Sequence, residues 1–328
     1  MNGMKNPDHK ALIARIEREA GVAGLLEILT KRLEPTDLQS LLLEVYSRLA
    51  MGISTKRLLE QYRNNRFLAL SSIDRRTISE IERLAWNLLP PGFEPLELSP
   101  LCPLGTHSIV AGISQNRIVS TARNSEVVAD PTNVLVLECA LRRRRLREMP
   151  GRRRERVLLA ASQRVVRAQL FTAHRHVAHF RLLTLCAAGR DEGSFRWEAR
   201  QLVEQIGFYV RLIREVARFG SEFGSVRLAV TDFTGGLLTR ILEQEVLQVI
   251  KNTLQPIECG FDPERTAGRN YYDRVCFKIF ASTNAREEIE LADGGPTVWT
   301  RTLLSDRKER LVSSGIGLER LCAAMAKG

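Results

Sequence analysis

The nine residues Ser313–Leu321, SSGIGLERL, constrain the fold more than any other stretch of this 328-residue chain. Two glycines stand two positions apart, and the pair Glu319-Arg320 follows with an apolar residue on either side. Glycine lets the backbone approach a ligand closely because it has no Cβ. We predict a Gly-x-Gly turn that opens a helix over Leu318–Met325. That helix fixes Arg320, and a fixed guanidinium is well suited to bind phosphate oxygens.

The first quarter of the chain predicts one helix after another. Apolar residues recur at three- and four-residue spacing in four segments, Ala11–Glu19, Val22–Arg32, Asp37–Leu49 and Thr55–Tyr62. We predict a helical accessory module at residues 1–70 and a second domain at residues 71–328. The module has no motif with an identifiable chemistry. Docking of tRNA, a carrier or a partner protein stays open, as does a role in dimerisation or stability.

A further predicted helix, Ile73–Leu89, ends at Pro90-Pro91-Gly92, and an extended stretch over residues 93–100 follows. Downstream, Asp130-Pro131-Thr132 is typical of a helix N-cap, with Glu126 four residues before it. The segment can be that cap alone or a loop that contacts a substrate, and the sequence leaves both interpretations open.

Two short strands are predicted at Val165–Leu170 and Phe180–Ala187, joined by a polar loop rich in histidine. The first carries Arg167 and Gln169, and His176 precedes Phe180 by four residues. An arginine can neutralise a phosphate, an amide carbonyl can accept a hydrogen bond from an adenine amino group, and an aromatic ring can stack on the base. Metal binding by His174, His176 and His179 is the alternative. It is disfavoured because no carboxylate or cysteine lies close by in the sequence.

Two more strands are predicted near the C-terminus. Gly268–Ala281 contains Tyr271, Tyr272 and Phe277, and Glu288–Ala292 ends at a Gly-Gly turn, Asp293-Gly294-Gly295.

The net charge is +11, and much of it is concentrated in Arg142–Arg156. This block holds nine arginines against two glutamates, which gives +7 in fifteen residues. Such a block attracts RNA with an affinity that falls as salt rises, or it forms a solvated basic surface. No aromatic residue interleaves with the arginines, so no base-stacking surface is expected there.

The composition excludes several classes of protein. No run of about 18 apolar residues is present, so no transmembrane helix is predicted. The polar residues Met1–Lys10 do not form a secretory signal. The six cysteines are scattered without a Cys-x-x-Cys pair, which predicts a reducing cytoplasm and argues against structural zinc.

In this order, the segments resemble the three motifs of the class II aminoacyl-tRNA synthetases. Ile73–Pro100 resembles motif 1, the strand pair with Arg167 and Phe180 resembles motif 2, and Ser313–Leu321 resembles motif 3. The loops at Asp130–Thr132 and Tyr271-Tyr272 resemble substrate loops of histidyl-tRNA synthetases. The resemblance covers roughly residues 73–325. It implies an α+β fold, an antiparallel six-stranded sheet flanked by helices, and a homodimer.

The resemblance also implies ligands and residue roles. ATP and Mg²⁺ are the implied cofactors, with Arg167 acting on the α-phosphate and Arg320 on the pyrophosphate as the catalytic residues. The nucleotide is assigned to Arg167, Gln169, His176, Phe180, Glu319 and Arg320. The substrate is assigned to Glu126, Asp130, Thr132, Tyr271, Tyr272 and Asp293.

Several positions depart from the histidyl pattern. Gln169 replaces a glutamate, Leu182 and Cys186 stand where histidine-binding polar residues are expected, and Ala267 replaces an arginine. Specificity for a polar side chain needs matched hydrogen bonds, so a histidine substrate is not expected. A C-terminal anticodon-binding domain is not expected either, because only eight residues follow Arg320.

We therefore expect an ATP-dependent ligase that forms an acyl-adenylate from another amino acid or small carboxylate. The acceptor would be tRNA, a carrier or a small amine. Two non-catalytic alternatives stay open. One is a histidyl-synthetase-like regulatory subunit, as of ATP phosphoribosyltransferase, and the other is an RNA-binding paralogue. Retention of Arg167 and Arg320 favours the enzyme.

Overall fold

The computed structural model describes residues 7–168, 178–218, 223–283 and 288–323. The chain forms two compact units, Met1–Asn64 with Thr121–Ser125, and Asn65–Ser120 with Glu126–Gly328. Two of the candidate site residues, Gln169 and His176, lie outside the described residues, as does His174.

The first unit is helical, as the sequence predicts. It contains α1 (Pro7–Ala20), α2 (Leu25–Glu27) with a π-helical continuation (Ile28–Arg32), α3 (Pro35–Met51) and α4 (Thr55–Asn64). None of the described side chains in these helices is buried, and Leu49, Met51 and Leu59 are more than half exposed. The unit thus lacks a buried apolar core over its described residues. Its role as an accessory module stays a prediction.

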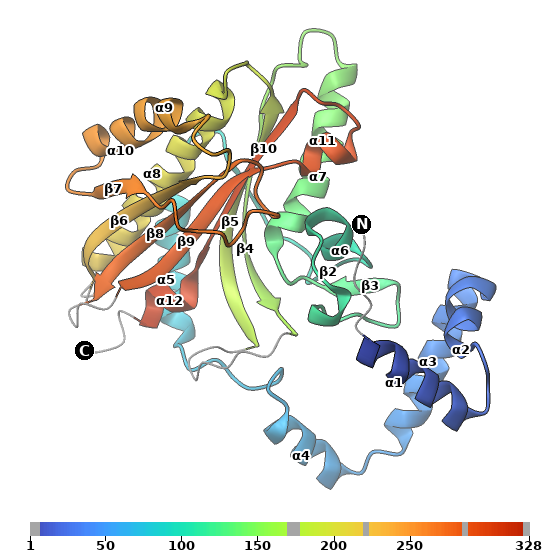
Figure 1. Cartoon of the computed structure of the whole chain (residues 1–328). Coiled ribbons are helices and arrows are strands. Elements are labelled where there is room, and N and C mark those ends of the chain that lie inside the picture. The colour runs from blue at the N-terminus through green and yellow to red at the C-terminus, as the bar shows by residue number, and fades with distance from the viewer. Residues whose placement is uncertain (1–6, 169–177, 219–222, 284–287, 324–328) are drawn as a thin grey trace. The chain divides into compact units, whose positions relative to one another are not determined.

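The second unit is built on an eight-stranded sheet (Figure 1). Its strands, in spatial order, are β1 (Glu94–Leu96), β4 (Val157–Val166), β5 (His179–Arg190), β10 (Glu309–Gly317), β9 (Glu288–Thr297), β8 (Val275–Thr283), β6 (Phe223–Asp232) and β7 (Glu258–Phe261). The six inner strands pair antiparallel, whereas β1 and β7 add parallel edges. The predicted α+β class and antiparallel six-stranded sheet are therefore confirmed, with one extra strand at each edge.

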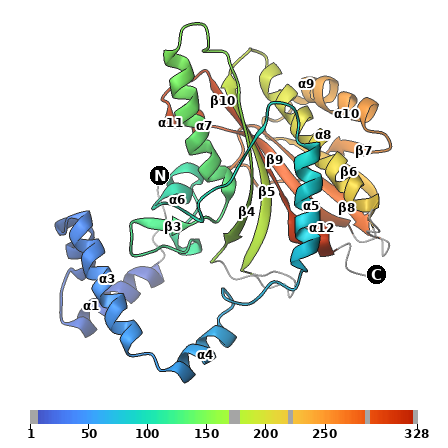
Figure 2. The ribbon, with the colours of Figure 1, turned by 180° about the vertical axis from the view of Figure 1, so that it is seen from behind.

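Helices cover both faces of this sheet because its strands alternate apolar side chains between the faces. On β4, Leu158 and Ala160 pack in one core and Leu159 and Ala161 in the other. Helices on the first side are α5 (Arg75–Leu88), α8 (Arg196–Arg218), α9 (Thr239–Leu242), a π-helical turn (Glu243–Leu247), α10 (Gln248–Thr253) and α12 (Leu318–Ala323). Figure 2 shows α5, α8 and α12 lying over the sheet on this side. The opposite core contains α7 (Pro131–Glu148) and α11 (Trp299–Leu303).

Between β1 and α7 the chain forms a small subdomain. It consists of β2 (Leu101–Pro103), α6 (Thr106–Ala111), a 3-10 turn (Gln115–Arg117) and β3 (Ser125–Val127), and β2 pairs with β3. The predicted N-cap of α7 is confirmed, because the Asp130 side chain accepts a hydrogen bond from the Thr132 N–H. This subdomain and the cap bring the start of α7 to the sheet.

Four local predictions were wrong. The strand predicted at Val165–Leu170 lies further upstream, since β4 covers Val157–Val166 and Arg167 follows it. Residues 268–274 form a turn, and β8 begins only at Val275. The glycines of Ser313–Leu321 do not form a turn either, since Gly315 and Gly317 lie in β10, which runs directly into α12. Gly294 lies inside β9, where a Cβ would stand 2.4 Å from the Ser314 Cβ. Gly294 and Gly315 therefore allow close packing against neighbouring strands rather than a change in chain direction.

Candidate functional site

Nine of the candidate residues line a single cavity of about 290 Å³, which we call the first cavity. They are Asp130, Thr132, Arg167, Phe180, Tyr271, Tyr272, Asp293, Glu319 and Arg320. Backbone of β10, including Gly315 and Gly317, forms another part of its wall. The sheet order explains this convergence, because β5, β10 and β9 are neighbours although their motifs are far apart in sequence.

The two arginines assigned to phosphate lie in different parts of the wall. Arg167 follows β4 directly, and its guanidinium carbon lies 5.0 Å from the centre of the Phe180 ring. Its Nε donates to the Ala129 carbonyl at 3.1 Å, and its Nη2 lies 3.6 Å from Asp130 Oδ2. Arg320 stands in the first turn of α12 and donates from Nη1 to the Glu290 carbonyl at 2.7 Å. Both guanidinium groups are thus held in place, largely by backbone carbonyls.

Glu319, the other motif 3 residue, points toward β4 and β5. Its Oε2 accepts from the Arg181 N–H at 2.7 Å, and its Oε1 lies 3.2 Å from Arg164 Nη2. These contacts tie the start of α12 to the two strands of motif 2. Its assignment to the nucleotide stays a prediction.

Two tyrosine–carboxylate pairs form the other end of the first cavity. The Tyr271 hydroxyl donates to Asp130 Oδ2 at 3.3 Å, and the Tyr272 hydroxyl donates to Asp293 Oδ2 at 3.1 Å. Thr132 completes the first pair by donating from Oγ1 to Asp130 Oδ1 at 2.7 Å. Burial raises the pKa of both tyrosines and the pKa of Asp293. Carboxylate and hydroxyl oxygens in this arrangement can accept hydrogen bonds from an ammonium group.

The loop that carries Asp130 is positioned by a buried His107–Glu126 pair. His107 Nε2 accepts from the N–H groups of Ala129 and Asp130, at 3.0 and 3.2 Å. Because Nε2 is an acceptor, the ring proton lies on Nδ1, which donates to Glu126 Oε1 at 2.6 Å. Glu126 was assigned to the substrate from the sequence, but the structure places it behind the first cavity rather than in its wall.

Hydrogen bonds account for the ionised state of Glu126. Burial opposes ionisation, but donors from the His107 N–H, Gln115, the Gly105 N–H and the His107 ring together lower the pKa of this carboxyl. The donor–acceptor distances from the His107 N–H, Gln115 and the Gly105 N–H are 2.9, 2.7 and 2.9 Å.

This buried pair also belongs to a cluster with metal-ligand chemistry. Cys102, His107 and Glu126 place ligand atoms within 4.8 Å of one another. Both ring nitrogens of His107 are already engaged, however, and burial raises the pKa of the Cys102 thiol to about 11. The cluster therefore serves as a structural support, because a metal needs free lone pairs and a thiolate.

Of the three histidines in the alternative metal-binding interpretation, His179 is the one that lies among the described residues. His179 contacts Arg164 Nη1 through Nδ1 at 2.8 Å and donates from Nε2 to the Ala69 carbonyl at 2.5 Å. Both of its ring nitrogens are occupied by these structural contacts.

Lys278 and Glu290 are among the site residues that the sequence did not predict. The β8–β9 register shifts between Ile279 and Phe280, so Asp293 pairs with Lys278 while Glu290 pairs with Phe280. This bulge turns Glu290 to the same face as Asp293, where its carboxylate lies 2.5 Å from Lys278 Nζ. No sequence signal marks the bulge.

A second cavity, of about 400 Å³, adjoins the first. The two share six residues, Asp130, Arg167, Tyr271, Tyr272, Glu290 and Asp293. Arg117, Arg265, Ala267 and Lys278 line only the second. Of the positions that depart from the histidyl pattern, Leu182 lines the first cavity and Ala267 the second, while Cys186 is buried and its thiol donates to the Thr132 carbonyl.

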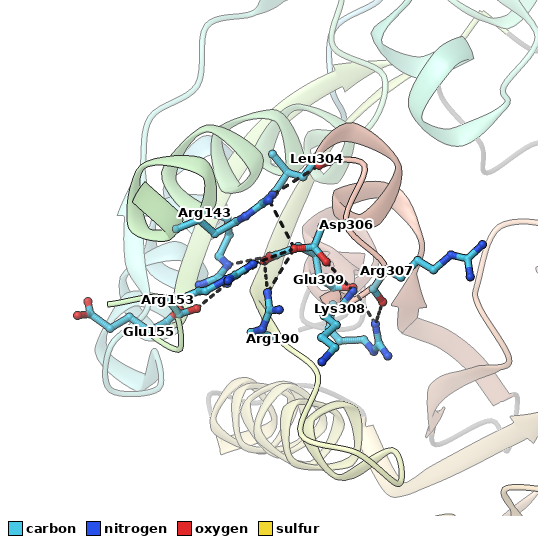
Figure 3. Close-up of polar contacts among 11 residues, drawn as sticks. Arg143, Arg153, Glu155, Arg190, Leu304, Asp306, Arg307, Lys308 and Glu309 are labelled. Atoms are coloured by element: carbon cyan, nitrogen blue, oxygen red, sulfur yellow. Dashed lines mark hydrogen bonds and ion pairs between the residues drawn. The ribbon is translucent and has the colours of Figure 1, made fainter. Parts of the chain in front are cut away.

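The arginine block contains a buried ion pair as well as exposed charge (Figure 3). Arg143 is fully buried against Glu309, and Asp306 receives Arg147, Arg153 and Arg190. Arg142, Arg152 and Arg156 also have acidic partners. Over the described residues, the block's arginines without a carboxylate partner are Arg144, Arg145 and Arg154, and all three are exposed.

Known proteins resemble this chain in fold but not in sequence. No protein-family model matches the sequence, and no curated protein matches it. A solved structure described as an ATP phosphoribosyltransferase regulatory subunit/histidyl-tRNA synthetase from Bacillus halodurans C superposes with a TM-score of 0.57 and 14% identity. That match covers 78% of this chain and 82% of the other. The chain has the fold of the class II aminoacyl-tRNA synthetases.

Two further class II synthetase structures share the fold. The apo histidyl-tRNA synthetase of S. aureus matches with a TM-score of 0.53 and 14% identity, over 76% of this chain and 64% of the other. The RNA-binding domain of threonyl-tRNA synthetase from Cryptosporidium parvum Iowa II matches with a TM-score of 0.53 and 10% identity, over 76% and 63%. The class II synthetase resemblance is confirmed for the fold, and this chain spans less than two thirds of these two synthetase chains.

All six cysteines are free thiols. None of the helices in the described part of the chain is both long and apolar enough to cross a membrane.

Proposed function

We propose that this protein is an ATP-dependent ligase that activates an amino acid other than histidine, or a related small carboxylate, as an acyl-adenylate. The observation that carries the proposal is the convergence of Arg167, Phe180 and Arg320 on the first cavity. These residues come from two separate sequence motifs, and each has the chemistry that nucleotide activation needs.

The wall of the first cavity fits a nucleotide. The ring of Phe180 offers an aromatic surface for a base, and the two arginines offer donors for phosphate oxygens. Gly315 and Gly317 present backbone without side chains, so a flat ligand can approach β10 closely. The cavity of about 290 Å³ joins the second, of about 400 Å³, and together they reach the size of typical ligand sites.

Magnesium also fits the available donors. Mg²⁺ is usually held by one or two carboxylates together with substrate phosphates. Glu290 and Asp293 line the first cavity and would supply such oxygens. Lys278 contacts Glu290 Oε2 and Tyr272 contacts Asp293 Oδ2, so the second oxygen of each carboxylate would be the one that binds the ion. Bound Mg·ATP would supply the α-phosphorus for attack by the substrate carboxylate, with pyrophosphate as the leaving group.

The residues of the chain would then bind and orient the reactants. Arg167 stands at the junction of the two cavities and would neutralise charge at the reacting phosphate. Asp130, Tyr271 and Thr132 would hold the substrate ammonium. No general base is required, because the attacking carboxylate is already ionised at neutral pH.

A direct test is ATP binding by calorimetry in the presence of Mg²⁺. Arg320→Ala removes one phosphate donor and should weaken ATP binding on the order of tenfold or more. Arg307→Ala is the matched control, because Arg307 is exposed and lies outside both cavities. Equal ATP affinity of wild type and a folded Arg320→Ala protein would refute the nucleotide assignment.

A non-catalytic regulatory subunit is the second candidate. It is favoured by the Bacillus halodurans structure, whose description includes an ATP phosphoribosyltransferase regulatory subunit and whose chain is covered to 82%. Binding of a small amino acid without any pyrophosphate exchange would select this function over the ligase.

Among the possible acceptors of the acyl group, we propose tRNA. The support is the exposed positive charge of Arg144, Arg145 and Arg154. A carrier or small amine would need no such surface.

A further inference from the structure

We propose that the second cavity binds a second oxyanion of the substrate, so that the acid activated by this protein is an acidic amino acid. The inference rests on the proposed function and names the substrate class of the same site. The evidence for it is the distribution of paired and unpaired charges in the wall of the second cavity.

Four cationic side chains and three carboxylates line the second cavity. Two of the cations are matched by carboxylates, Lys278 by Glu290 at 2.5 Å and Arg167 by Asp130 at 3.6 Å. The third carboxylate, Asp293, is bound by the Tyr272 hydroxyl, and burial raises its pKa. The remaining cations are Arg117 and Arg265.

Neither Arg117 nor Arg265 forms an ion pair with any carboxylate in the described parts of the chain. The second cavity therefore has an excess of positive charge, although its wall includes three acidic residues. An excess of positive charge in a concave, partly shielded site favours binding of an anion.

Arg265 is held in a fixed orientation. Its Nε donates to the Ala267 carbonyl at 3.0 Å, and its Nη1 approaches the Phe277 carbonyl at 3.5 Å. A Cβ on Gly268 would stand 3.4 Å from Arg265 Nη2, so the glycine, at a φ of +91°, leaves room for the guanidinium. An arginine fixed by carbonyls on one side can present its other N–H groups to a carboxylate at little entropic cost.

The second cavity is also within reach of the reacting group. Arg167 lines both cavities, as do Tyr271 and Tyr272. A substrate whose reacting carboxylate lies beside Arg167 can therefore extend its other end into the second cavity without leaving the site. The small side chain of Ala267 keeps that space open.

Pairs of ligands that match in size but differ in charge test this inference. We would measure binding by calorimetry, with ATP and Mg²⁺ present, for glutamate against glutamine, aspartate against asparagine and phosphoserine against serine. One acidic member should bind at least tenfold more tightly than its neutral partner, and its affinity should fall as salt rises.

The variant Arg265→Gln should remove this preference while ATP affinity stays unchanged. Arg269→Gln is the matched control, because Arg269 lies on the same turn but stacks on Phe233 and lines neither cavity. A second variant, Arg265→Lys, retains charge without the two-pronged geometry and should recover part of the preference.

Two results would overturn the inference while leaving the proposed function intact. One is tighter binding of a neutral amino acid than of every acidic one, and the other is an acid preference that survives in Arg265→Gln. Failure of ATP itself to bind would instead contradict the proposed function. In that case, binding of the acidic ligands measured without ATP still decides whether the second cavity is an anion site.

Discussion

The Arg143 guanidinium and the Glu309 carboxylate form a fully buried two-point ion pair, with Nε–Oε2 at 2.8 Å and Nη2–Oε1 at 2.9 Å. Arg143 also donates to the carbonyls of Glu155 and Arg153 (Figure 3). The pair joins α7 to the first residue of β10, the strand that leads to Arg320. One residue of the basic block is therefore a structural member of the fold.

Replacing Arg143 with Met should lower the free energy of unfolding by up to about 3–5 kcal/mol, because it removes the two-point partner of the buried Glu309 carboxylate and leaves it Arg190 at 3.7 Å. Denaturant unfolding measures this change. The exposed neighbour Arg144 is the matched control, and Arg144→Met should change stability by less than about 0.5 kcal/mol. Equal effects of the two substitutions would contradict the structural role of the pair.

RNA binding should depend on the exposed arginines and not on the whole block. The triple substitution of Arg144, Arg145 and Arg154 by Gln should reduce the slope of log affinity against log salt by up to about 2–3, at roughly 0.7–0.9 per lost phosphate contact. Substitution of all three by Lys keeps the charge and should leave the slope nearly unchanged. If the wild-type protein does not bind RNA at low salt, the arginine block is a solvated basic surface and not an RNA-binding site.

Stability should depend on pH through Glu126. Hydrogen bonds hold the pKa of this carboxyl below its ordinary value of 4.5, despite its burial. A carboxyl with a lowered folded pKa stabilises the protein above its unfolded pKa, and that stabilisation is lost as pH falls through the folded pKa. Glu126→Gln should therefore cost about 1.5–3 kcal/mol at pH 7 and progressively less below pH 4.5.

Urea unfolding of wild type and Glu126→Gln over a range of pH measures this difference directly. Because the two proteins share every other titrating group, their difference reports on Glu126 together with the His107 ring, which contacts it at 2.6 Å. A difference that stays constant from pH 7 to pH 3 would show that ionisation of Glu126 does not stabilise the fold.

Gly294 should tolerate no side chain. A Cβ there would stand 2.4 Å from the Ser314 Cβ and 2.7 Å from the Phe277 ring, so Gly294→Ala forces β9 and β10 apart. Overpacking of this kind costs about 1–3 kcal/mol. Gly260→Ala in β7 is the control, because nothing lies within 4 Å of its added Cβ, and its stability should change by less than about 1 kcal/mol. Thermal unfolding of both variants checks the prediction.

Local signals made the elements and the convergence of the site predictable. The proline and capping residues at Asp130-Pro131-Thr132 define the start of α7, and the motif residues Arg167 and Arg320 lie in one cavity as the resemblance implies. These features depend on short-range chemistry or on a known order of motifs, both of which a sequence carries.

Features that depend on strand register were not predictable. The bulge that brings Glu290 to Lys278 depends on the pairing between β8 and β9, and no residue type in the sequence indicates it. The sequence predicts turns at Gly294 and Gly315, because a turn and a close strand contact both select glycine. The burial of Arg143 was missed for a similar reason, since its partner Glu309 lies in a distant segment.

Pyrophosphate exchange tests the proposed ligase activity itself. Purified protein, ATP, Mg²⁺ and labelled pyrophosphate would be incubated with each member of a panel of amino acids and small carboxylates. We expect label in ATP with a small set of these acids, histidine excluded, and loss of that exchange in Arg167→Ala and Arg320→Ala. Absence of exchange with every member of the panel, in a folded protein that binds ATP, would contradict the ligase and favour the regulatory function.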